Sequence, residues 1–94
     1  MEHNTVDVRK VLDARAEEYG SYIVGVHNRA KIMQALNTIH KDRHGAALPA
    51  DVSVIFSDII LKLMRLAANP EHRDSWVDLA GYATLAKEAK VKQC

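Results

Sequence analysis

The chain has 94 residues, 48% of them hydrophobic, a length that supports a single domain (1–94) with one modest core. Thirteen basic side chains nearly balance twelve acidic ones, leaving a net charge of +1, so a nucleic-acid partner is not expected. No apolar run is long enough for a membrane partner, and one cysteine, Cys94, fits a reducing, cytoplasmic location.

Apolar residues recur at three- and four-residue spacing in four segments, and no segment alternates as a strand does. The predicted helices span residues 5–19, 21–41, 51–68 and 74–89. Thr5 and Asp74 are predicted N-caps, residues 41–50 are predicted to form a loop, and Trp76 is expected to pack. The pattern predicts an all-α fold, a compact antiparallel bundle of four helices. The third helix is apolar around most of its circumference, so we expect it to be central and the protein to be a homo-oligomer.

The third predicted helix carries three charges in one stripe. Asp58, Lys62 and Arg65 are spaced i, i+4 and i+7, and such residues share a helix face. Two cations three residues apart can hold a phosphate or diphosphate. An ordinary helix-face ion pair between Asp58 and Lys62 explains the same spacing. Both interpretations remain open at this point.

The fourth predicted helix places two carboxylates and a phenol, Asp74, Asp78 and Tyr82, along one face. The carboxylates could hold Mg²⁺, or could pair with Lys62 and Arg65 across the helical hairpin. An N-cap role alone would explain Asp74.

Tyrosines and histidines give weaker signals. Tyr19 and Tyr22 flank a bend between the first two helices, where their rings could stack on a nucleobase or close a small core. His40 and His44 have i, i+4 spacing, but no cysteine or glutamate joins them in a metal-binding pattern. No serine or cysteine lies in a context typical of a catalytic nucleophile.

Several of these motifs together resemble a family of short phage and prophage proteins of unknown function. The matching parts, within about Val8 to Lys87, are Arg15, Tyr19-Gly20, Tyr22, K-L-M-R-L (62–66) and D-S-W-V-D-L-A-G-Y (74–82). That family is similar to all-α nucleotide pyrophosphohydrolases of the MazG type and to phage domains associated with nucleotide modification. The resemblance implies a helical, nucleotide-binding oligomer.

The sequence departs from the MazG pattern at the metal ligands. MazG-type enzymes hold Mg²⁺ with an E-x-x-E pair and an E-x-x-D pair of carboxylates. Here the central helix offers only Asp58, and Lys62 stands where a second acid is expected. A metal site built from these residues is short of ligands, whereas Lys62 and Arg65 can meet phosphates without a metal.

The leading hypothesis is a phage-type protein that binds a nucleotide, or a cyclic nucleotide signal of bacterial defence, without turning it over. It would act in the cytoplasm of the infected host. In this hypothesis Lys62 and Arg65 hold the phosphates, and Tyr19 or Tyr22 stacks on a base. Asp78 and Tyr82 orient the cations or bond the sugar.

Two alternatives come from other classes of protein. The first is a Mg²⁺-dependent nucleoside triphosphate pyrophosphohydrolase whose metal ligands are Asp58, Asp74 and Asp78, with Glu17 or Glu18 completing the set. The second is a helical protein-interaction module that blocks a host protein and whose charges are all structural.

Overall fold

The computed structural model describes residues 8–91, which form four α-helices and no strand. These helices are α1 (Val8–Tyr19), α2 (Tyr22–His44), α3 (Ala50–Ala68) and α4 (Arg73–Lys90). The predicted all-α class and the four predicted helices are confirmed. Thr5, the predicted first N-cap, lies outside the described residues.

The second helix extends further than its apolar pattern indicates. It continues to His44 and ends where Gly45 adopts a left-handed conformation with φ of 76°, which glycine reaches without steric cost. The Gly45 N–H then donates to the Lys41 carbonyl. The prediction of a loop over 41–50 is therefore wrong at both ends, because residues 41–44 belong to α2 and Ala50 begins α3. Lys41, Arg43 and His44 are cations that favour the last turn of a helix.

The fourth helix is capped by His72, so the prediction that Asp74 is its N-cap is wrong. The His72 Nδ1 atom accepts from the Ser75 N–H at 3.3 Å and lies 2.8 Å from the Ser75 hydroxyl. An imidazole nitrogen here accepts the hydrogen bond that a carboxylate or hydroxyl oxygen usually accepts at an N-cap. Asp74 instead lies in the first turn, where a negative charge complements the helix dipole.

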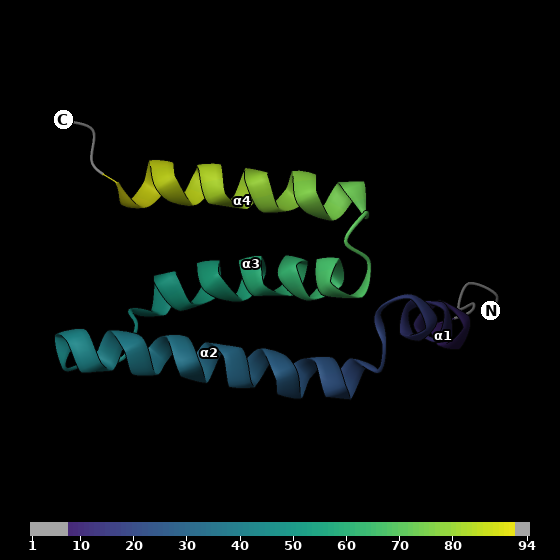
Figure 1. The fold of residues 1–94 in the computed structure, drawn as a ribbon, viewed down its shortest axis with the longest axis horizontal. Helices are drawn as coiled ribbons and strands as arrows, with labels where there is room; N and C mark the ends of the chain where they lie inside the picture. Colours follow the sequence, from purple (N-terminus) through teal and green to yellow (C-terminus); the bar gives the residue numbers. More distant parts are fainter. Residues whose placement is uncertain (1–7, 92–94) are drawn as a thin grey trace, which may run out of the picture.

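The helices α2, α3 and α4 lie side by side and antiparallel in one layer, with α3 in the middle (Figure 1). The tertiary contacts of α3 are mainly with α4 and α2, and α1 also contacts α3. Figure 1 shows α1 beyond the end of α2, seen almost along its own axis. The predicted central position of α3 is confirmed.

The core of a single chain is small. Among the described residues, only two apolar side chains, Ile60 and Leu66, are buried. Trp76, which was expected to pack, is 52% exposed. The radius of gyration is 16.6 Å, whereas a compact chain of this length has about 12 Å. No helix within residues 8–91 has both the length and the apolar character needed to cross a bilayer.

Candidate functional site

A buried ammonium group lies between α3 and α4. The Lys62 side chain is only 9% exposed, and its Nζ atom lies 2.8 Å from Oδ2 of Asp78, whose side chain is 47% exposed. The antiparallel hairpin causes this meeting, because α4 returns along α3 after the short turn through Asn69 and Pro70. The cross-hairpin pair is one of the alternatives that the sequence leaves open, and the structure shows it in place of a pair with Asp58.

The ion pair leaves hydrogen-bonding capacity on both partners. An ammonium carries three N–H donors, and a carboxylate offers several lone pairs. One carboxylate oxygen satisfies at most one of the Lys62 donors, and no other described residue interacts with the group. A nearly buried charge is costly unless its donors are occupied. Oxygen atoms of water or of a ligand must therefore accept from the remaining N–H donors of Lys62. The exposed part of Asp78 can meanwhile accept from a hydroxyl or an amino group.

The remaining polar candidates of α3 and α4 differ in how far they are exposed. Arg65 lies nearly one turn along α3 from Lys62 and is half-buried, as is Tyr82, one turn beyond Asp78 on α4. Asp58 and Asp74 are exposed, and neither makes an ion pair with a described residue. The structure thus joins Lys62 to Asp78 directly, and it places Arg65 and Tyr82 on the same two helices.

Of the two predicted stacking residues, the structure describes the side chain of Tyr22 only. Tyr22 is 80% exposed at the start of α2. The Tyr19 side chain lies outside the described residues. Stacking on a base stays a prediction for both tyrosines.

The acidic residues proposed as metal ligands do not gather. Within the part of the chain that the structure describes, no three His, Cys, Asp or Glu side chains are placed to hold a metal ion. Asp58, Asp74 and Asp78 therefore do not form a ligand set there. His40 and His44 have ring centroids 4.4 Å apart, but His40 uses Nδ1 in a 2.8 Å contact with the Ala46 carbonyl. This contact ties the end of α2 to the following loop.

A second ion pair joins α3 and α4 near their other ends. Lys90 Nζ lies 2.6 Å from Oδ2 of Asp51. The hydrogen bond from Lys90 is the main cause that lowers the pKa of Asp51 from its usual 3.8, followed by the bond from the Val52 N–H. Both partners are well exposed, so water can accept from the remaining N–H donors of Lys90.

A shallow groove on the outer half of α2 was not anticipated from the sequence. Its volume is about 400 Å³, and it is lined by Ala30, Met33, Gln34, Asn37, Thr38, Lys41 and Ala47. None of the predicted site residues lines it. The Asn37 side chain is already used, because its Oδ1 accepts from the Leu48 N–H at 2.9 Å. No periodicity or motif in the sequence marks this groove.

The fold and the ion pair define a small all-α protein built on an antiparallel helical hairpin, with one charged residue buried between the two helices. The chain belongs to the family described as Domain of unknown function (DUF6378), whose model matches residues 7–90. No curated protein and no solved structure matches it.

Proposed function

We propose that this protein binds a nucleotide, or a nucleotide-derived signal, on the face of the α3–α4 hairpin and does not turn it over. One observation carries the proposal: the Lys62 ammonium is nearly buried, has Asp78 as its one partner among the described residues, and must meet further oxygen atoms. Phosphate oxygens are strong acceptors for such a group.

The neighbouring groups suit the other parts of a nucleotide. Arg65 can add a planar fork of donors on the same face of α3. The exposed part of Asp78 can accept from a sugar hydroxyl or from the amino group of a base, and the Tyr82 phenol can donate or accept. A ligand with a phosphate and several hydroxyl or amino groups therefore matches this mixture better than a simple anion, which Asp78 would repel.

Binding without cleavage follows from how the charges are arranged. Metal-assisted hydrolysis of a phosphoanhydride needs several convergent carboxylates that hold Mg²⁺ and activate water. In the hairpin, Asp78 is engaged by Lys62, and a lysine ammonium neutralises a phosphate without generating a hydroxide nucleophile. We propose that such a protein, of phage type and distantly similar to MazG enzymes, sequesters a cyclic nucleotide messenger of bacterial defence.

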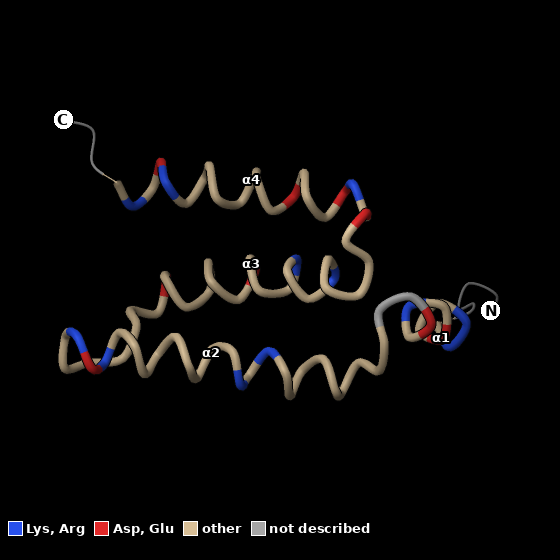
Figure 2. The backbone as a smooth tube through the Cα atoms, viewed as in Figure 1, with Lys and Arg blue, Asp and Glu red and all other residues tan. Residues whose placement is uncertain are grey.

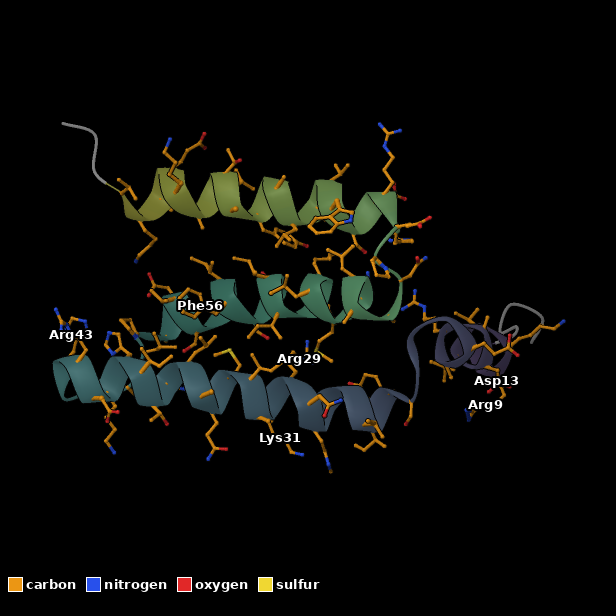
Figure 3. All side chains as sticks on the ribbon, viewed as in Figure 1. Arg9, Asp13, Arg29, Lys31, Arg43 and Phe56 are labelled. Carbon is orange, nitrogen blue, oxygen red and sulfur yellow. The ribbon has the colours of Figure 1, made fainter. Side chains whose placement is uncertain are left out.

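Titration calorimetry with cyclic dinucleotides, cyclic ADP-ribose isomers and deoxynucleoside triphosphates tests the proposal. We expect one class of ligand to bind, and Lys62→Met to weaken that binding at least about tenfold, because a charge-assisted hydrogen bond is lost. Lys31→Met is the matched control. Lys31 is exposed and extends from α2 away from α3, whereas Arg29 extends toward α3 (Figure 3).

The other outcomes identify the rival functions. Absence of binding by every ligand, with the helical circular dichroism spectrum intact, would end the proposal. Release of pyrophosphate in the presence of Mg²⁺, abolished by Asp78→Asn, would support the pyrophosphohydrolase instead. A Lys62→Ala variant that loses stability but still captures a protein partner would favour the interaction module.

A further inference from the structure

Two histidines lie one turn apart at the end of α2. His40 and His44 are spaced i, i+4, and their ring centroids are 4.4 Å apart with an angle of 37° between the ring planes. His40 is half-buried and His44 is exposed. Residues i and i+4 share one face of a helix, so the backbone itself brings the two imidazoles together at a surface that an ion can reach.

The hydrogen bond of His40 determines which of its ring nitrogens can bind a metal. Nδ1 lies 2.8 Å from the Ala46 carbonyl oxygen. Because a carbonyl oxygen can only accept, Nδ1 must carry the proton. A neutral imidazole has one N–H, which leaves Nε2 of His40 with an unprotonated lone pair. Histidines that bind metals are typically held in this way, with the other ring nitrogen donating to a carbonyl or a carboxylate.

The turn after α2 places that carbonyl beside His40. Gly45 ends the helix with φ of 76°, and its N–H donates to the Lys41 carbonyl. The chain then turns back, so that Ala46, six residues after His40, reaches the imidazole ring. The backbone thus orients the His40 ring before any ion arrives, which lowers the entropic cost of binding.

The electrostatics of this end of α2 combine one favourable and one opposing contribution. The last carbonyl groups of a helix give its C-terminus a partial negative charge, which favours a cation. Lys41 and Arg43 flank the histidines and oppose a cation, with Asp42 between them in the sequence, and all three side chains are exposed. Figure 2 shows these charged positions at the end of α2 that is farther from α1. Because water and salt screen exposed charges, the two cations weaken metal binding without preventing it.

We propose that His40 and His44 together bind a divalent transition-metal ion of the Zn²⁺ class. Imidazole nitrogen suits Zn²⁺, Cu²⁺ and Ni²⁺, whereas Mg²⁺ and Ca²⁺ prefer oxygen ligands. The described residues supply no third ligand, so water fills the remaining positions of the ion. Because His40 also holds the Ala46 carbonyl, a bound ion would fix the last turn of α2 and the loop that leads to α3. This inference stands apart from nucleotide binding.

Proton–nitrogen correlation spectra of the imidazoles, recorded by NMR on the full-length chain during a Zn²⁺ titration, test the site. His27 is the internal control, since it is exposed on the same helix and has no histidine one turn away in either direction. We expect Nε2 of His40 and one ring nitrogen of His44 to shift with a single midpoint. His27 should bind at least about tenfold more weakly, because it lacks a second ligand. Mg²⁺ should shift none of these signals.

Glutamine variants separate the pair from a lone imidazole. His40→Gln and His44→Gln should each weaken zinc binding at the remaining histidine to the level of His27, whereas His27→Gln should leave the pair unchanged. The spectra resolve each imidazole, so zinc bound elsewhere in the chain does not obscure the result. Separate midpoints for His40 and His44 in the wild type overturn the proposal, because two independent imidazoles do not form a chelate.

The tautomer of His40 is a readout that needs neither a variant nor a metal. At about pH 8, above the titration range of free imidazole, His40 should carry its proton on Nδ1. A proton on Nε2 instead overturns the proposal, since the nitrogen that faces the ion would then have no lone pair. The absence of any shift at His40 and His44 up to about 1 mM Zn²⁺, the range of weak specific binding, overturns it too.

Discussion

Two lysine–aspartate pairs connect α3 to α4, and they differ in how much water surrounds them. The pair nearer the turn joins Lys62 to Asp78 at 2.8 Å, and its lysine side chain is 9% exposed. The pair at the far end joins Lys90 to Asp51 at 2.6 Å, with side chains that are 44% and 63% exposed. The shorter distance belongs to the more exposed pair.

Distance alone therefore does not determine how much an ion pair contributes to stability. Water and salt screen the far pair and can replace either partner at little cost. Lys62 has lost most of its hydration, so its charge depends on Asp78 and on whatever meets its other donors. The end of the hairpin nearer the turn should therefore tolerate substitutions poorly, and the far end should tolerate them well.

The largest effect should come from Asp78→Ala. This change leaves the Lys62 ammonium nearly buried without a counter-ion, which costs several kcal/mol in fully buried sites. Because water reaches Asp78, we expect a loss of about 2 to 3 kcal/mol in the free energy of unfolding, or about 10 °C in Tm. Urea and thermal denaturation followed by circular dichroism measure both quantities.

Asp51→Ala is the matched control for that experiment. Its cost should be much smaller and should vanish in about 0.5 M salt, where exposed charges are screened. The double variant Lys62→Met/Asp78→Leu should recover most of the stability lost in Asp78→Ala, since no unpaired buried charge remains. Equal losses from Asp78→Ala and Asp51→Ala would show that burial does not distinguish the two pairs.

A middle-sized effect should come from the cap of α4. His72→Ala removes the acceptor for the Ser75 N–H, and loss of an N-cap costs about 1 kcal/mol. His72→Asn should retain most of the stability, because an asparagine oxygen can accept the same bond. Chemical denaturation of both variants, with the exposed Arg73→Ala as control, measures the difference. If His72→Asn loses as much as His72→Ala, then contacts of the ring other than the cap dominate.

The sequence predicted Asp74 as the N-cap of α4, and this prediction was wrong because His72 caps the helix with a ring nitrogen. Propensity rules favour Asp74 over His72 at an N-cap, and they do not include an imidazole that accepts with Nδ1. The end of α2 was missed for a different reason. Its last turn has no apolar periodicity, so only Gly45, in the left-handed region, marks the boundary.

The Lys62–Asp78 ion pair was one of the alternatives predicted from the sequence. A charged stripe on an otherwise apolar helix requires partners, and this requirement singles out Lys62 from the sequence alone. Spacing alone could not choose between Asp58, on the same helix, and Asp78, across the turn. Packing decides, because the antiparallel return of α4 brings Asp78 to 2.8 Å. Trp76 was misjudged because the size of a side chain does not tell whether its own chain covers it.

The smallest effect should be the pH dependence contributed by Asp51. Its pKa in the folded chain lies below the usual 3.8, mainly because Lys90 donates a hydrogen bond to it. A lowered pKa stabilises the folded state at pH values above 3.8 and loses that contribution as the pH falls through the folded pKa. The stability difference between wild type and Asp51→Asn should therefore be constant near neutral pH and disappear in acid. Urea denaturation between about pH 7 and pH 3, which spans the titration of a carboxylate, measures it. A difference that persists at the acid end would mean that the Asp51 carboxylate stabilises the chain through something other than its charge.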